Sequence, residues 1–218
     1  MYSFAQRSDT RVLDEPLFGH FLAHTGVDRP SRSEVLTTMP TTAVAALASL
    51  EPEPSDRVLF LKHMANHLEG FSWDQVDGPE HRHVILTRHP DGVLPSYRSH
   101  IDKPTMLDLG YVHQRQILER ASNPVVVTAE SLFAQPEATL RALCVALDLP
   151  WEANMLTWNP GGRPEDGVWA PYWYQSVHRS SGWEPRQLSY GQVPESFRKL
   201  RDRCLEHYLA LESRAVTP

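Results

Sequence analysis

The chain has 218 residues, of which 41% are hydrophobic and 22% are charged. This length suits one domain of ordinary size, and this composition is that of a folded globular protein rather than a disordered one. The 21 Lys and Arg against 27 Asp and Glu give a net charge of −6, which disfavours sustained binding of nucleic acid by a basic face. An anionic ligand would therefore be held by a few placed cations.

The first residues and the cysteines indicate the cellular compartment in which we expect the protein. The start, MYSFAQRSDT, lacks the basic residues and apolar run of a secretory signal. Cys144 and Cys204 show no CxxC spacing, so we expect a reducing compartment, no structural zinc and a cytoplasmic location. The longest helix-like apolar stretch, residues 43–50, is too short to cross a bilayer, so no membrane span is expected.

Four short runs rich in Val, Ile, Leu and Phe predict strands. They cover residues 10–13, 57–61, 83–87 and 124–128. Their apolar character is continuous rather than alternating, which is typical of parallel strands that are covered on both faces.

Segments with helical spacing of apolar residues lie between and after these runs. Residues 31–50 should form two helices split by Pro40, and single helices are predicted over residues 104–122, 135–149 and 194–213. The alternation predicts an α/β fold, with a parallel sheet flanked by helices and right-handed crossovers. We expect one domain, with its α/β core over residues 1–157, an aromatic loop or lid region over 158–192 and the last helix over 193–214.

Charged residues follow each apolar run. The runs end in Asp14-Glu15-Pro16, Lys62-His63, Arg88-His89-Pro90 and Glu130. Ligands of open parallel sheets bind at the carboxyl ends of the strands, and Arg and Lys are the usual partners of phosphate and sulfate. Two cations and two acids would thus converge on one edge of the sheet, which favours an anion site, although strands also simply stop where polar residues begin.

The third run is the most informative. HVILTRHPDGVLPSYRSH predicts a strand, then Arg88, then a helix that opens near Pro90. Ser96 lies about two helical turns from Arg88, so its hydroxyl could help to hold the same phosphate. The alternative is that Ser96 is an ordinary helix serine.

This segment resembles the 3′-phosphate-binding segment of sulfotransferases: an apolar strand, Arg, a Pro-containing turn, and Ser eight residues after the Arg. The resemblance implies that Arg88 and Ser96 hold the 3′-phosphate of 3′-phosphoadenosine 5′-phosphosulfate (PAPS), the co-substrate, and of its product 3′-phosphoadenosine 5′-phosphate (PAP). Residues 125–151 are similar to the late strand-and-helix unit of bacterial sulfotransferases. Residues 1–22 and 166–183 are similar to segments of a less studied bacterial group of sulfotransferase-like proteins. The implied fold is the three-layer P-loop NTPase type.

One part of the family pattern is missing. In sulfotransferases the first strand leads into a Gly/Ser/Thr-rich loop whose amides cradle the 5′-phosphosulfate. This sequence has no GxxxxGK[ST] and no GxGxxG before its first apolar run, and the strand expected at the centre of the sheet is also absent. We therefore expect the natural chain to begin further upstream. If residues 1–218 were the whole protein, we would expect weak nucleotide binding and poor catalysis.

Candidate catalytic residues follow from the resemblance. Glu15 is the candidate base that accepts the proton of the acceptor, with His63 or His67 as the second choice, and Lys62 is the candidate for stabilising the leaving nucleotide. Several sulfotransferases carry Lys-x-His at the equivalent strand end, whereas this chain reads Lys62-His63-Met64. Two alternatives remain: Glu15 could cap the helix after Pro16, and Lys62 could be a solvated strand end.

Two further groups of residues have alternative interpretations. His63 and His67 could form one face of a metal site, but there is no HExxH pattern or third ligand nearby, so no metal is expected. Aromatic residues gather in one segment, where they pack a core or form a wall for the acceptor or the adenine ring: Trp169, Tyr172, Trp173, Tyr174 and Trp183.

The sequence thus predicts an enzyme, a PAPS-dependent sulfotransferase that transfers a sulfuryl group to a hydroxyl or amine of a small molecule or sugar. One alternative is a non-catalytic nucleotide-binding or interaction module of the same fold. Another is a P-loop-type small-molecule kinase, which would need the missing loop and magnesium ligands. The sequence ranks no acceptor and does not indicate the oligomeric state.

Overall fold

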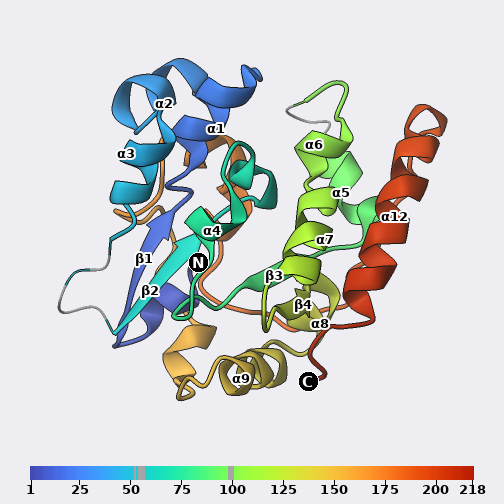
Figure 1. The fold of residues 1–218 in the computed structure, drawn as a ribbon. Helices are drawn as coiled ribbons and strands as arrows, with labels where there is room; N and C mark the ends of the chain where they lie inside the picture. Colours follow the sequence, from blue (N-terminus) through green and yellow to red (C-terminus); the bar gives the residue numbers. More distant parts are fainter. Residues whose placement is uncertain (52, 54–56, 98–100) are drawn as a thin grey trace. The chain divides into compact units, whose positions relative to one another are not determined.

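The computed structural model describes residues 1–51, 53, 57–97 and 101–218. These residues form two compact units, shown together in Figure 1. Unit 1 contains residues 1–76 and 152–183, and unit 2 contains residues 77–151 and 184–218. The predicted single domain, with boundaries after residues 157 and 192, stays a prediction.

Unit 1 contains one pair of parallel strands. Strand β1 (Thr10–Asp14) pairs with β2 (Val58–Lys62), with Thr10 opposite Val58 and Asp14 opposite Lys62. Both strands were predicted to within one residue, because their apolar runs are short and continuous. The register matters for the chemistry because it brings the last residues of the two strands side by side.

Helices α1 (Phe18–Thr25), α2 (Arg32–Thr38) and α3 (Ala43–Ala48) lie between these strands in the chain. The predicted split of residues 31–50 at Pro40 is confirmed, and the Thr42 side chain caps α3 by accepting the Ala45 N–H. Phe21, Leu22 and Val35 are fully buried among these helices. A 3-10 helix, η2 (Ala65–Leu68), and α4 (Trp73–Val76) follow β2.

The rest of unit 1 is built from short elements. These are the 3-10 helices η1 (Phe4–Gln6) and η3 (Ala153–Leu156) and the single-turn helices α10 (Ala170–Trp173) and α11 (Gln175–His178). Arg7 links the two stretches of chain that form unit 1, because its fully buried guanidinium lies 2.8 Å from Asp9 and 3.8 Å from Glu152. The part of the predicted aromatic region that lies in unit 1, residues 158–183, packs on the N-terminal residues, since the Trp183 Nε1–H donates to Ser3 Oγ at 2.8 Å.

Unit 2 contains a second parallel pair, β3 (Val84–Thr87) and β4 (Val125–Thr128), with Val84 opposite Val125. Strand β3 contacts helices α7 (Tyr111–Arg120) and α12 (Arg198–Glu212), and β4 contacts α8 (Ala129–Ala134), α9 (Pro136–Ala146) and α12. Parallel strands flanked by helices make this an α/β protein, as predicted. The strands form two separate pairs in the described residues, so the expected meeting of all four strand ends at one edge stays a prediction.

The other helices of unit 2 include α5 (Pro90–Tyr97) and the 3-10 helix η4 (Glu195–Phe197), which precedes α12. The single helix predicted over residues 104–122 is wrong. Helix α6 (Met106–Leu109) ends at Gly110, whose left-handed backbone (φ 70°) starts α7 in a new direction. Apolar spacing alone did not reveal this break, because Leu109 and Tyr111 are buried on both sides of it.

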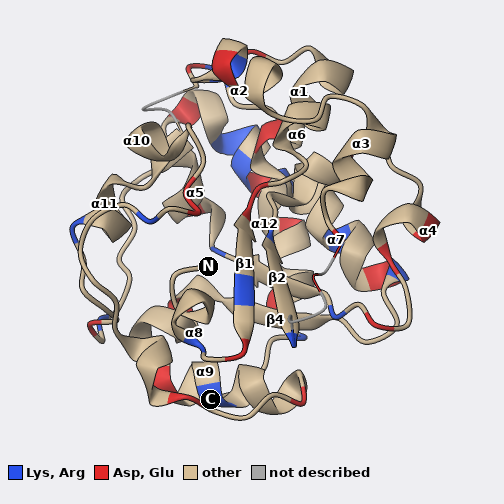
Figure 2. Cartoon of the chain, turned by 90° about the vertical axis from the view of Figure 1, so that its left-hand side faces the viewer, with Lys and Arg blue, Asp and Glu red and all other residues tan. Residues whose placement is uncertain are grey.

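The core of unit 2 lies under α12, which packs on α5 and α7. One buried cluster of this core consists of Leu94, Leu109, Tyr111, Cys204 and Tyr208, and a second consists of Ile85, Val126 and Leu211. Cys144 and Cys204 are both buried, and neither forms a disulfide within the part of the chain that the structure describes. Basic and acidic residues are interspersed along the elements (Figure 2), and no helix within the described ranges is long and apolar enough to cross a membrane.

Candidate functional site

In unit 1, Glu15 follows β1 in an unusual backbone conformation. Its φ of 46° places it in the left-handed region, which is costly for a residue with a side chain and is often retained at functional sites. Hydrogen bonds hold it there: its N–H donates to the Lys62 carbonyl at 2.7 Å, and its carbonyl accepts from the Phe18 N–H at 2.9 Å. The Glu15 side chain does not cap α1, so the capping alternative is wrong.

Lys62, the last residue of β2, points its ammonium group at the acidic end of β1. Its Nζ donates to Glu15 Oε1, lies 3.5 Å from Asp14 Oδ1 and donates to the Tyr174 hydroxyl at 2.7 Å. The Glu15 and Asp14 side chains are 8% and 0% exposed, and that of Lys62 is 24% exposed. Lys62 is therefore part of a largely buried ion pair and not a solvated strand end.

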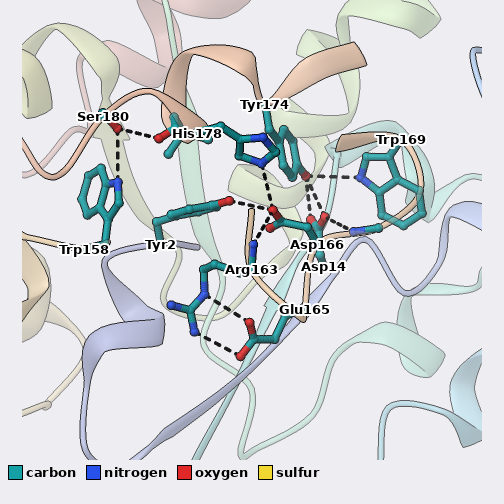
Figure 3. Close-up of polar contacts among 12 residues, drawn as sticks. Tyr2, Asp14, Trp158, Arg163, Glu165, Asp166, Trp169, Tyr174, His178 and Ser180 are labelled. Atoms are coloured by element: carbon teal, nitrogen blue, oxygen red, sulfur yellow. Dashed lines mark hydrogen bonds and ion pairs between the residues drawn. The ribbon is translucent and has the colours of Figure 1, made fainter. Parts of the chain in front are cut away.

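Tyr174, between α10 and α11, completes this group. Its hydroxyl donates to Asp14 Oδ1 at 2.7 Å and accepts from the Trp169 Nε1–H at 3.3 Å (Figure 3). Burial, followed by the charges of Glu15 and Asp14, raises the pKa of Tyr174 far above its usual value. The hydroxyl therefore stays protonated and acts as a donor to Asp14.

Asp14 is the most buried carboxylate of the group. Besides Tyr174 it accepts the Gly167 N–H at 3.1 Å. Burial raises the pKa of Asp14, and Lys62 opposes that effect. Two carboxylates thus face one ammonium group in a low-dielectric site, where charge interactions are stronger than in water.

The two histidines differ in their surroundings. His67, 3% exposed in its side chain, packs against the rings of Phe18 and Phe21, with its Nδ1 3.7 Å from Glu15 Oε2. Burial, and then the charges of Lys62 and Arg29, lower the pKa of His67 well below its usual value, so the ring is neutral. His63 is half-buried. The assignment of either histidine as a base stays a prediction.

A third carboxylate, that of Asp166, links the loop segment to the N-terminal residues (Figure 3). Its Oδ2 lies 2.7 Å from the Tyr2 hydroxyl, 2.9 Å from His178 Nε2 and 3.0 Å from the Arg163 N–H. Because Gly167, the next residue, bonds to Asp14, this cluster supports the backbone that holds the buried carboxylate.

In unit 2, Arg88 follows β3 and precedes α5, as predicted. Helix α5 begins at Pro90, and Ser96 lies exposed in its last turn; residues 98–100 of the quoted segment lie outside the described residues. The guanidinium carbon of Arg88 lies 5.4 Å from the centre of the Tyr190 ring, and the Tyr111 hydroxyl donates to the Arg88 carbonyl at 2.5 Å. The roles of Arg88 and Ser96 in phosphate binding stay predictions.

The structure thus brings Glu15 and Lys62 into direct contact in unit 1 and places Arg88 and Ser96 on one strand–helix unit in unit 2. Sequence reasoning missed Tyr174, which it treated only as one member of an aromatic cluster. Nothing in the local sequence distinguishes Tyr174 from the exposed Tyr172, since only tertiary structure brings residue 174 to Asp14. In the described part of the chain, no group of three His, Cys, Asp or Glu could hold a metal ion.

A sequence model of the sulfotransferase domain matches residues 1–215. The chain belongs to the sulfotransferase-domain family. This membership confirms the predicted resemblance to sulfotransferases and supports a sulfotransfer-type function.

Two curated relatives of this family member come from Arabidopsis thaliana and are named branched-chain-amino-acid aminotransferase-like proteins 1 and 2. The chain is 38% identical to each, over 98% and 95% of its own length. It spans only 39% and 38% of their lengths. Among solved structures, the chain is similar to a sulfotransferase domain from the curacin biosynthetic pathway, with 14% identity, 88% of this chain and 78% of that chain covered, and a TM-score of 0.46.

Proposed function

We propose that this chain transfers a sulfuryl group from PAPS to a hydroxyl or amine of a small molecule or sugar. The observation that carries the proposal is the contact between Lys62 and Glu15 at neighbouring strand ends of a sulfotransferase-family chain. A cation and a carboxylate held together supply the two groups that sulfuryl transfer needs.

In the proposed reaction, an acceptor oxygen or nitrogen forms a bond to the sulfur of the donor while the bond between that sulfur and the bridging oxygen breaks. Glu15 accepts the proton that the acceptor loses, and Lys62 neutralises the negative charge that develops on the bridging oxygen. PAP leaves with that charge. Positioning and charge stabilisation supply most of the rate, as in phosphoryl transfer.

For the 3′-phosphate we propose Arg88, with Ser96 as a second contact. Arg88 suits this role because its Nε is buried and has no hydrogen-bond partner in the described part of the chain. A buried donor of this kind favours an acceptor such as a phosphate oxygen.

The test is calorimetric titration with PAP, with 5′-AMP and ATP as controls, on the wild type and on Arg88→Ala. We expect PAP to bind more tightly than 5′-AMP and Arg88→Ala to remove most of that preference. A wild type that does not distinguish PAP from 5′-AMP would contradict the proposal and favour a non-catalytic interaction module. Preference for ATP would favour a kinase.

A further inference from the structure

Arg88 lies in a setting that leaves its charge available. In the described residues no carboxylate forms an ion pair with its guanidinium, and its buried Nε has no hydrogen-bond partner. Its main neighbour is the face of the Tyr190 ring, 5.4 Å from the guanidinium carbon. A cation on an aromatic face is held in place while its N–H donors stay free for an anion.

The Tyr190 ring is itself anchored. Its hydroxyl donates to Glu130 Oε1, and the same carboxylate accepts the backbone N–H of His89, the residue after Arg88, at 3.0 Å. Burial and the bond to Glu130 raise the pKa of Tyr190 to about 12, so this hydroxyl remains a donor at neutral pH. Glu130 therefore links the ring to the backbone next to Arg88.

Gly92, in the first turn of α5, provides the space for this arrangement. A Cβ atom at residue 92 would lie 2.3 Å from Cε1 of Tyr190 and 2.7 Å from Nε of Arg88. Both distances are far below a van der Waals contact. Any other residue at this position would displace the ring, the guanidinium or both.

We propose that Glu130 and Tyr190 are positioning residues that hold the Arg88 guanidinium for the 3′-phosphate, and that Gly92 is required because it leaves room for both side chains. The inference rests on the proposed function, which assigns the 3′-phosphate to Arg88. It adds three residues to the nucleotide site: Gly92, Glu130 and Tyr190.

The test compares the affinities for PAP and 5′-AMP by calorimetry in Tyr190→Phe, Glu130→Gln and Gly92→Ala. We expect the preference for PAP to fall about five- to tenfold in each variant, while the affinity for 5′-AMP is unchanged. Matched controls are Gly191→Ala, where an added Cβ meets nothing within 4 Å, and Tyr172→Phe, at a tyrosine that is 45% exposed. Both controls should keep the wild-type preference.

A double-mutant cycle separates positioning from general stability. In an Arg88→Ala background, Tyr190→Phe should have no further effect on the preference for PAP, whereas a merely structural effect would act in both backgrounds. If Arg88→Ala removes the preference and the other variants keep it, this inference is wrong and the proposed function stands. If Arg88→Ala also keeps it, the proposed nucleotide site is wrong.

A measurement without nucleotide tests the same geometry. The Nε–H of Arg88, identified by the loss of its signal in Arg88→Ala, should give a slowly exchanging NMR signal shifted by the Tyr190 ring current. Tyr190→Leu should abolish that shift, and Tyr172→Leu should leave it unchanged. If the chemical shift of the Arg88 signal in Tyr190→Leu equals that in the wild type, the inference is overturned.

Discussion

The Tyr174 hydroxyl lies within 3.3 Å of Lys62, Asp14 and Glu15. Removing it in Tyr174→Phe leaves Asp14 without its shortest hydrogen bond and Lys62 without one acceptor. Because unsatisfied buried polar groups cost about 1–3 kcal/mol, we expect the free energy of unfolding to fall by about that amount. Urea denaturation measures this change.

Tyr2→Phe is a suitable comparison for that variant. It removes a hydroxyl that donates to another carboxylate of unit 1, Asp166, at 2.7 Å. Asp166 keeps its contacts with His178 and Arg163, so we expect a smaller loss of stability. If Tyr174→Phe is as stable as the wild type, the ring is held by packing and its hydroxyl contributes nothing.

His67 gives the chain a specific pH dependence. The lowered pKa of buried His67 means that the unfolded chain takes up a proton near pH 6.5 while the folded chain does not. The stabilisation is therefore fully present above that pH and is lost as the pH falls below it, with a slope of at most about 1.4 kcal/mol per pH unit. Urea titrations between about pH 5 and pH 7 should show this slope.

In His67→Phe this part of the slope should disappear. Phenylalanine keeps the stacking with Phe18 and Phe21, and His67 Nδ1 has no hydrogen-bond partner in the described residues that would be lost. Equal slopes in the wild type and His67→Phe would show that other groups set the acid sensitivity.

Individual site residues were predictable where a strand supplied the position. Glu15 and Lys62 were identified because each follows an apolar run, and parallel pairing then brought them together. The positive φ of Glu15 and the hydrogen bond from Tyr174 to Asp14 were not predictable. Both depend on contacts between residues about 50 to 160 positions apart, which local patterns do not encode.

At the scale of the elements, strands were predicted more accurately than helices. The four strands are short and continuously apolar, and their observed bounds differ from the predicted ones by a residue. The break at Gly110 was missed because one glycine within a helical pattern is compatible with either a continuous helix or a C-cap. Only the left-handed backbone at this residue distinguishes them.

Helix α1 depends on a close approach that can be tested at Gly19. A Cβ at this position would lie 2.6 Å from the Pro40 carbonyl oxygen and 2.8 Å from Met39 Cβ. Helix propensity alone would make Gly19→Ala stabilising by about 1 kcal/mol, whereas the clash should destabilise by about 1–3 kcal/mol. The sign of the change in unfolding free energy therefore decides which effect is larger.

Gly191→Ala is the control for the Gly19→Ala experiment, because nothing lies within 4 Å of its added Cβ. We expect its unfolding free energy to stay within about 0.5 kcal/mol of the wild type. A stabilised Gly19→Ala variant would show that α1 can move away from Met39 and Pro40 at little cost.

For the whole molecule, the alternation of strands and helices was sufficient to predict the α/β class. It was not sufficient to predict the organisation into two units, each built from two separate stretches of chain. Local periodicity shows which segments are strands or helices, but the return of residues 152–183 to the N-terminal strands depends on specific contacts. The buried Arg7 and the Gly167–Asp14 bond are two of them.

This division of the chain has a consequence for synthesis on the ribosome. Strands β1 and β2 emerge early, but Gly167 and Tyr174, which bind Asp14, are translated only after most of unit 2. At about 5–20 residues per second, roughly 5–20 seconds pass between the synthesis of β2 and the synthesis of these partners. During that time its Asp14, Glu15 and Lys62 side chains lack their final surroundings, so cotranslational chaperones would have an unfinished unit 1 to protect.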